Sequence, residues 1–173
     1  MTNYRNDCAL FVPGCLLCPK FQASPTSDLH WRSEILTLLV DSGVNIVQMP
    51  CPEASFGGFN VGLHRLPHGI KYYEGAPYFC EHCGKLAAET LEKIESLENS
   101  GCRILAIVGI EHSPTCAVNY MYTNKGTIKR KGIFIEQVYQ MVRMKHSGIT
   151  FIGINRRYPK RAIEEINRIL TLP

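Results

Sequence analysis

Short runs of apolar, mostly β-branched residues recur along the chain and predict strands. Two of them, ILAIVGI at residues 104–110 and ITFIGI at residues 149–154, show no alternation between apolar and polar positions. Continuous runs of this kind are typical of strands that are buried on both faces, as in a parallel sheet. The predicted strands cover residues 8–12, 44–49, 103–110 and 149–154.

Segments with apolar residues at helical spacing alternate with the predicted strands. Three of them are followed by a glycine (Gly43, Gly101 or Gly148) that stands just before the next strand. A glycine just past the last helical turn is a common way to end a helix. The predicted helices cover residues 28–42, 84–100 and 133–147, and a fourth opens at Pro159, a residue that suits the first helical position.

This alternation predicts repeated βα units. We therefore expect residues 1–173 to form a single α/β domain, a three-layer Rossmann- or flavodoxin-like sandwich with a four-stranded, mainly parallel sheet. Residues 50–83 fit neither pattern, because they are rich in glycine, proline and tyrosine. A connection of this length is usually functional. Because it follows the second strand, we predict a long active-site loop at the carboxyl edge of the sheet.

Composition narrows the class of protein. Hydrophobic residues make up 45% and charged residues 20% of the 173 residues, which excludes a disordered chain. No apolar run approaches the ~18 residues of a membrane span, and the apolar stretch before Cys15 is too short for a secretory signal. We therefore expect a cytoplasmic protein without a membrane partner, whose thiols are mostly reduced.

The charge is uneven along the chain. Residues 125–173 contain eleven Lys or Arg and three Asp or Glu, a balance of +8, whereas the whole chain carries +4. A basic end attracts anionic partners such as RNA. No aromatic–basic nucleic-acid motif accompanies the charge in the sequence, so we expect the solvated face of two surface helices and no nucleic-acid partner.

Cysteine is the unusual component, since the chain has eight of them and enough apolar residues to fold without disulfides. Cys15 follows the first predicted strand, Cys51 the second and Cys116 the third. The carboxyl ends of parallel strands meet at one edge of a sheet, so we expect these three residues to converge. Converging thiolates in a reducing compartment suit a soft metal site, with zinc or an iron–sulfur cluster as the two candidates.

The other cysteines leave alternatives open. Cys18 forms a CxxC pair with Cys15 and is a natural co-ligand, although the proline after it turns the chain away. Cys80 and Cys83 form a second CxxC pair, separated from the first by a gap of 61 residues, at a helix start that would lower a thiol pKa. That gap is too long for a zinc ribbon, so we expect either an exposed pair without a role or a redox pair. The cysteines expected in the core are Cys8 and Cys102.

Polar residues in the same predicted loops complete a candidate active site. Glu53 stands two residues after Cys51, and a carboxylate beside a metal centre can move protons because burial raises its pKa toward neutrality. Ser113 stands three residues before Cys116 and is placed to orient a substrate or a water molecule. Other residues that these loops contribute are Glu111, His112, Gly57, Gly58, Gly62, His64, Arg65 and His68.

Three short motifs stand in order at the predicted strand ends: CLL at residues 15–17, CPE at 51–53 followed by GG at 57–58, and SPTC at 113–116. As a set they resemble the thiouracil desulfidase family, long catalogued as a domain of unknown function. The resemblance covers residues 8 to about 120. Cys18 has no counterpart in the family pattern, which suggests a related subgroup.

The resemblance implies an iron–sulfur-dependent desulfidase. Cys15, Cys51 and Cys116 would hold a [4Fe-4S] cluster and leave one iron open to bind the sulfur of a small thiolated, thiouracil-like compound. Glu53 would be the base that activates water, and Ser113 would position the substrate or stabilise developing charge. Sulfur would leave as hydrosulfide, without a net redox change.

Two other functions are compatible with the same residues. One is a non-catalytic zinc-binding or redox module that uses the CxxC pairs. The other is a reductive enzyme related to the hydroxyacyl dehydratase components, which also use clusters with an open iron. A requirement for an electron donor and ATP would distinguish that second alternative from a hydrolytic desulfidase.

Overall fold

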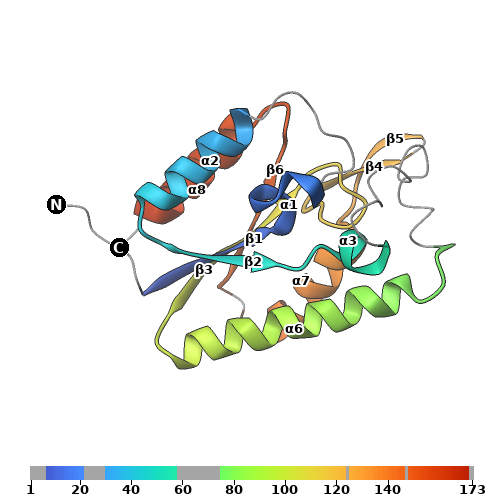
Figure 1. The fold of residues 1–173 in the computed structure, drawn as a ribbon, viewed down its shortest axis with the longest axis horizontal. Coiled ribbons are helices and arrows are strands. Elements are labelled where there is room, and N and C mark those ends of the chain that lie inside the picture. Colours follow the sequence, from blue (N-terminus) through green and yellow to red (C-terminus); the bar gives the residue numbers. More distant parts are fainter. Residues whose placement is uncertain (1–6, 22–29, 58–74, 124, 147, 172–173) are drawn as a thin grey trace.

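The computed structural model describes residues 7–21, 30–57, 75–123, 125–146 and 148–171. The centre of the fold is a sheet of four parallel strands in the order β2-β1-β3-β6 (Figure 1). This arrangement confirms the α/β class and the parallel sheet predicted from the continuous apolar runs. The strands are β1 (Cys8–Pro13), β2 (Asn45–Met49), β3 (Arg103–Ile110) and β6 (Thr150–Ile154).

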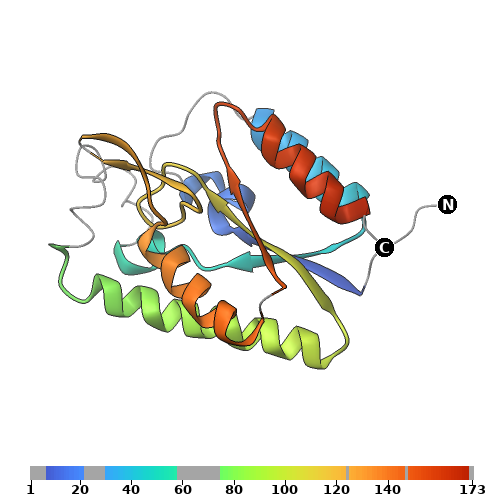
Figure 2. The ribbon, with the colours of Figure 1, turned by 180° about the vertical axis from the view of Figure 1, so that it is seen from behind.

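Helices cover both faces of the sheet, which gives the three layers seen in Figures 1 and 2. Helices α2 (His30–Asp41) and α8 (Lys160–Thr171) lie on one face, and α6 (Phe79–Asn99) and α7 (Ile133–Lys145) lie on the other. Side chains of a strand alternate between the faces. Leu10 of β1 accordingly packs with Ile35 and Ile166 in one core cluster, whereas Phe11 packs with Phe134 in the other.

Two of the predicted helix–glycine–strand junctions depend on a left-handed backbone. Gly43 has a φ of 68° and Gly101 a φ of 86°, in the region that a residue without Cβ adopts at little cost. Each of these glycines turns the chain from the end of a helix into the next strand, as predicted.

The region predicted as one long loop, residues 50–83, is helical at both ends. A short helix, α3 (Pro52–Gly57), directly follows Cys51. Helix α6 begins at Phe79 rather than at Gly84, because Phe79, Cys83 and Leu86 continue its buried stripe toward the amino terminus. The expectation of a loop is therefore wrong for these residues. The candidates Gly58, Gly62, His64, Arg65 and His68 lie outside the described residues.

A two-stranded antiparallel hairpin, formed by β4 (Tyr120–Thr123) and β5 (Gly126–Lys129), stands beyond the carboxyl end of β3. Buried Glu111 fixes the hairpin to the sheet, since its carboxylate accepts hydrogen bonds from the backbone N–H of Asn119 (3.2 Å) and of Tyr120 (2.8 Å) and from the Asn119 side-chain amide (2.9 Å). The apolar-run pattern did not predict this hairpin.

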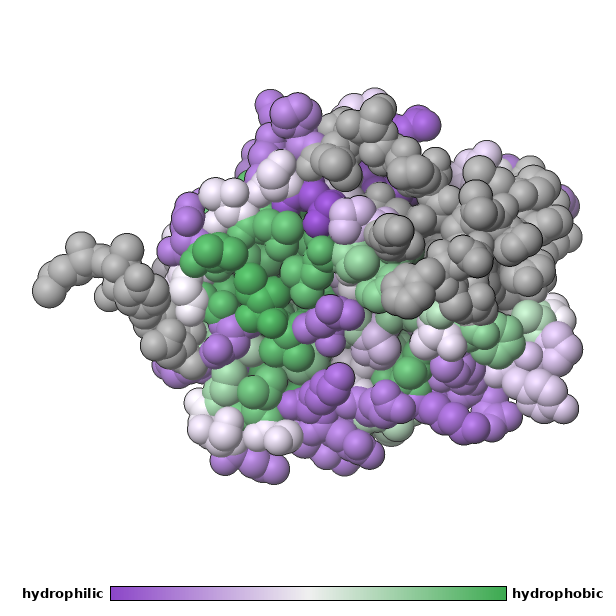
Figure 3. Space-filling model, in the orientation of Figure 1, coloured by the Kyte–Doolittle hydropathy of each residue, from purple (hydrophilic) through white to green (hydrophobic). Residues whose placement is uncertain are grey.

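Apolar side chains reach the surface along the outer edge of the sheet. Figure 3 shows them gathered around β2, between α2 and α6, on the face that Figure 1 presents. Ile46 and Val47 of this edge strand are only partly buried, and Val40 at the end of α2 is 65% exposed. None of the described helices is long and apolar enough to cross a membrane.

Candidate functional site

The three strands that precede the predicted ligands are neighbours in the sheet. Cys15 lies in the short helix α1 (Gly14–Leu17), which starts where β1 ends. Cys51 follows β2 after a single proline, and Cys116 lies six residues past β3. Because β2, β1 and β3 are adjacent and parallel, all three cysteines leave the sheet at its carboxyl edge.

The pKa of Cys116 depends on which groups lie near its thiol. It is buried, and burial is the largest cause that raises its thiol pKa well above the ordinary value. The neighbouring thiols of Cys51 and Cys15 raise this pKa further, as does Glu53, while a hydrogen bond with Thr115 lowers it. The structure therefore brings Cys15, Cys51 and Glu53 close enough to Cys116 to influence its ionisation.

The short helix α1, which carries Cys15, is fixed at its carboxyl end by Arg32. The Arg32 side chain of α2 donates from Nε to the carbonyl oxygen of Leu16 at 2.7 Å and from Nη2 to that of Leu17 at 3.2 Å. These carbonyls end α1 and would otherwise lack helical partners. Cys18 ends the same helix through its backbone N–H, which donates to the Gly14 carbonyl at 2.8 Å.

Glu53 is placed by α3. Pro52 opens this helix, where its missing N–H removes no hydrogen bond, and Glu53 follows in the first turn. The Cys51 carbonyl accepts a hydrogen bond from the Ser55 backbone N–H at 3.0 Å, so Cys51 itself begins the turn. The Glu53 side chain is 3% exposed, although carboxylates are almost never fully buried without a partner.

A chain of hydroxyl groups provides that partner. The Thr115 hydroxyl donates to Glu53 Oε1 at 2.6 Å. The same hydroxyl also lies 3.5 Å from Cys116 Sγ and 3.2 Å from the Ser113 hydroxyl. While its single hydrogen points to Glu53, it cannot also be donated to Cys116, and Ser113 is the donor in the contact between the two hydroxyls. Ser113 Oγ in turn accepts from the backbone N–H of Cys116 at 3.0 Å and of Thr115 at 3.3 Å. Ser113 thus organises the loop, and Thr115, which the sequence reading missed, contacts the carboxylate.

The loop that carries Ser113 and Cys116 is clamped by α7. The first helical N–H groups of α7 donate to loop carbonyls: Ile133 to Pro114 at 3.0 Å, and Phe134 and Ile135 to Thr115 at 3.1 Å each. A Cβ on Gly132, just before this helix, would overlap with the backbone of Thr115 and Cys116. Only glycine lets the two backbones approach so closely.

The second CxxC pair borders the same site. Cys80 is exposed, but Cys83 is fully buried, so the expectation of an exposed pair is wrong for Cys83. Burial, followed by the nearby Cys80 and Glu53, raises the pKa of Cys83 to about 12, opposite to the lowering expected at a helix start. His82 stands between these two cysteines, and its Nε2 lies 2.7 Å from the Ser55 hydroxyl of α3.

Cys8, Cys102 and Glu111 contribute to the packing and anchoring of the fold. Cys8 and Cys102 are buried in the two core clusters, as predicted. Glu111 anchors the hairpin rather than the thiols. The described stretches contain no group of three or more His, Cys, Asp or Glu side chains arranged to hold a metal ion.

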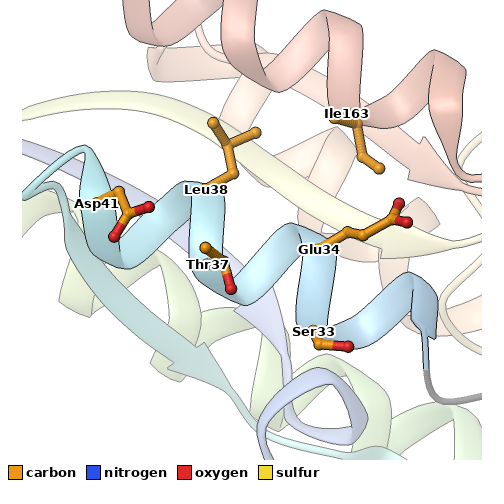
Figure 4. Close-up of a pocket in the computed structure, with 6 residues that line it drawn as sticks. All are labelled: Ser33, Glu34, Thr37, Leu38, Asp41 and Ile163. Atoms are coloured by element: carbon orange, nitrogen blue, oxygen red, sulfur yellow. The ribbon is translucent and has the colours of Figure 1, made fainter.

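Hollows in the surface do not all lie near this chemistry. A hollow of about 570 Å³ lies between α2 and α8 (Figure 4). Its lining contains none of the predicted site residues. A smaller one, of about 330 Å³, lies at the carboxyl ends of β3 and β6 and is lined in part by Glu111 and His112, directly before Ser113.

Among curated proteins, the chain is similar to "Uncharacterized protein MJ0003" of Methanocaldococcus jannaschii, with 25% identity over 110 residues. The matched stretch covers 64% of this chain and 61% of that protein, so the chain spans less than two thirds of the relative's length. No protein-family profile matches the chain. No solved structure matches it either. The fold and the site geometry therefore carry the functional argument.

Proposed function

We propose that this protein is a desulfidase that uses an iron–sulfur cluster to remove sulfur hydrolytically from a small thiolated heterocycle of the thiouracil type. The observation that carries the proposal is the grouping of Cys15, Cys51 and Glu53 around the buried thiol of Cys116. The reaction consumes one water, replaces the carbon–sulfur double bond with a carbon–oxygen double bond and releases hydrosulfide. It therefore needs neither an oxidant nor a reductant.

The three thiols suit a cluster by the type of their donor atom, although the side chains of the described stretches are not arranged around a metal ion. Thiolates are the ligands that iron–sulfur clusters use, and three strand ends supply them. Burial disfavours the bare Cys116 thiolate, so a bound cationic centre would stabilise the ionised form that the chain alone does not. When bound, the cluster would supply an iron with an open position that polarises the sulfur of the thiocarbonyl.

The side chains around the thiols would handle water and protons. Glu53 would accept a proton from the attacking water as the carbon–oxygen bond forms. The hydrogen bond from Thr115 to Glu53 Oε1 fixes the carboxylate, and Ser113 orients the Thr115 hydroxyl. Ser113 is thus a positioning residue in this proposal. Thiolate ligands require reduced cysteines, so the proposal includes a reducing, cytoplasmic location.

Anaerobic purification and reconstitution, with iron and acid-labile sulfide counted per chain, test the ligand set. We expect about four of each in the wild type, as a [4Fe-4S] cluster requires, and a large loss in Cys51→Ala and Cys116→Ala. Cys80→Ala removes an exposed cysteine and serves as the control, with unchanged iron. A colourless protein that contains zinc and no labile sulfide would overturn the proposal.

Hydrosulfide release from thiouracil tests the role of Glu53. Glu53→Gln should keep the iron content and lose turnover, because the amide cannot accept the proton. A Glu53→Gln protein that retains full activity shows that another group is the base, while the ligand assignment stands on the iron count.

A zinc or redox module remains the second candidate, because Cys83 lies beside Glu53 and next to Cys80. The double variant Cys80→Ala/Cys83→Ala separates the two functions. If it loses most of its metal while Cys15→Ala keeps it, the second CxxC pair holds the metal and the desulfidase reading has the wrong ligands.

A further inference from the structure

A basic and aromatic surface surrounds the β4–β5 hairpin. Residues 120–131 and 155–161 together contain eight Lys or Arg and no Asp or Glu. The same two stretches contain Tyr120, Tyr122 and Tyr158. All three tyrosines are exposed in the structure, so aromatic rings accompany the basic side chains at the surface.

The register of the hairpin puts tyrosines and cations on one side. Tyr120 pairs with Lys129 and Tyr122 pairs with Thr127. Cross-strand partners in an antiparallel pair project from the same face, so these four residues share a face. Met121, between the two tyrosines, points to the other face and is fully buried, which fixes this orientation.

One end of this surface is hollow. The cavity of about 330 Å³ at the carboxyl ends of β3 and β6 is lined by Tyr122 and Tyr158 together with Arg156 and Arg157. Its volume lies in the range of small-ligand sites, ~300–1,000 Å³. Glu111 also lines it, but the oxygens of this carboxylate accept the N–H groups that anchor the hairpin, which offsets its charge.

A second cavity, of about 400 Å³, lies further along β6 and continues the basic character. Here Lys131 Nζ lies 4.3 Å from the ring centroid of Tyr139, and the Arg143 guanidinium carbon lies 5.1 Å from it. Asn155 lines the first cavity and Phe151 the second, so the edge strand β6 connects them. Figure 2 shows β6, α7 and the hairpin on the same side of the molecule.

We propose that this surface binds single-stranded nucleic acid along β6, from the hairpin to α7. The arginines and lysines would neutralise phosphates, and unpaired bases would stack on Tyr122 and Tyr158. Stacking platforms beside a cationic groove are the common design of proteins that bind single strands. An anionic membrane is a poorer match, because the tyrosine rings line a cavity with arginines instead of forming an apolar face to insert. The proposal does not depend on the desulfidase function.

Fluorescence anisotropy with the full chain and labelled 12-nucleotide oligo(U) and oligo(dT) tests the proposal. We expect binding that weakens with salt, with a slope of log affinity against log salt of about −0.7 per phosphate contacted. The double variant Arg156→Gln/Arg157→Gln should reduce the magnitude of this slope by about 1.4, at that value per contact. Tighter binding of one oligonucleotide identifies RNA or DNA as the partner, and either supports the proposal.

Matched variants separate stacking and site-specific contacts from general attraction. Tyr122→Ala should weaken binding about 5- to 150-fold at every salt concentration, whereas Tyr122→Phe keeps the ring and should bind like wild type. Arg168→Gln removes one exposed charge near the far end of α8 and should have little effect. Equal losses for Arg168→Gln and an Arg156→Gln single variant, equal affinity for duplex DNA, or binding to phosphatidylserine vesicles without oligonucleotide binding would each overturn the proposal.

Discussion

Thr115 joins the two halves of the candidate site. Its hydroxyl reaches Glu53 on α3, and its backbone carbonyl accepts two N–H groups of α7. It precedes Cys116 directly, so any movement of Thr115 moves both the carboxylate and the thiol. This single residue therefore sets the geometry between the proposed base and the proposed cluster ligand.

Thr115→Val keeps the shape of the side chain and removes the hydroxyl. Glu53 would then remain buried without its 2.6 Å donor, and we expect the free energy of unfolding to fall by ~1–3 kcal/mol. Thr115→Ser, which retains the hydroxyl, is the control. Urea denaturation of the metal-free proteins measures both. A Val variant as stable as the Ser variant would show that Glu53 does not rely on Thr115.

Cys80 and Cys83 should differ in reactivity despite their CxxC spacing. The pKa of Cys83 is raised from 9.0 to about 12, which lowers its thiolate fraction near neutral pH about a thousandfold. Cys80 is exposed on the same helix. Brief treatment with iodoacetamide followed by mass spectrometry should modify Cys80 and spare Cys83 until the protein is unfolded. Equal modification would mean that α6 opens at its start.

The same shift predicts a pH dependence of stability. A thiol whose pKa is raised by folding ionises first in the unfolded chain, so its contribution to stability is complete below about pH 9 and is lost as the pH rises toward 12. Cys83→Ala should therefore show a shallower loss of unfolding free energy over this window than wild type, measured by urea denaturation at several pH values. Parallel pH profiles would contradict the burial of this thiol.

At the scale of elements, close backbone contacts hold the loop after β3. Gly109 of β3 and Gly132 before α7 each lie where a Cβ would overlap with the backbone at residues 115–116. The loop thus packs closely against both β3 and the residue before α7. Its carbonyls also accept hydrogen bonds from the first N–H groups of α7. These backbone contacts therefore help to position Cys116, in addition to the contact of its Sγ with the Thr115 hydroxyl at 3.5 Å.

Gly132→Ala tests the close packing between Gly132 and the backbone of the loop. The added methyl would press on the Thr115 carbonyl, and we expect the free energy of unfolding to fall by ~1–3 kcal/mol, as for other overpacked sites. Gly148→Ala is a matched control, because nothing lies within 4 Å of its Cβ position. Thermal unfolding measures both variants. Equal effects of the two substitutions would show that the backbone around Thr115 moves to accept the methyl group without a loss of stability.

The elements differ in how well the sequence predicts them. Strands buried on both faces carry an unbroken apolar signal, so all four strands of the main sheet were expected within a residue or two. The hairpin was missed because each strand has only four residues and its outer side chains face solvent. The early start of α6 was hidden by the proline- and tyrosine-rich stretch before it, although Phe79, Cys83 and Leu86 keep helical spacing.

The sequence predicts those parts of the candidate site that follow from the order and direction of the strands. Parallel neighbouring strands bring Cys15, Cys51 and Cys116 to one edge, and this follows from strand positions alone. The Glu53–Thr115 hydrogen bond joins residues 62 apart, on α3 and on the β3 loop, and no local pattern encodes it. The burial of Cys83 likewise depends on how α6 packs against the sheet. The CxxC spacing alone does not predict it, because the spacing is the same whether a pair is exposed or buried.

At the scale of the whole molecule, one loop serves two regions of the carboxyl edge. Glu111 and His112 line the basic cavity beside β6, and Cys116 lies near the thiols of Cys15, after β1, and Cys51, after β2. The strand order β2-β1-β3-β6 therefore sets the cysteines and the basic surface side by side.

The clamp between this loop and α7 has a consequence for backbone amide exchange with solvent. First-turn amides of a helix usually lack partners and exchange quickly, but those of Phe134 and Ile135 donate to the Thr115 carbonyl at 3.1 Å. In hydrogen–deuterium exchange they should be as slow as the Ile110 amide, which donates to the Cys116 carbonyl. Fast exchange at the start of α7 would mean that the Cys116 loop opens in the native protein, and a ligand that binds Cys116 should then slow it.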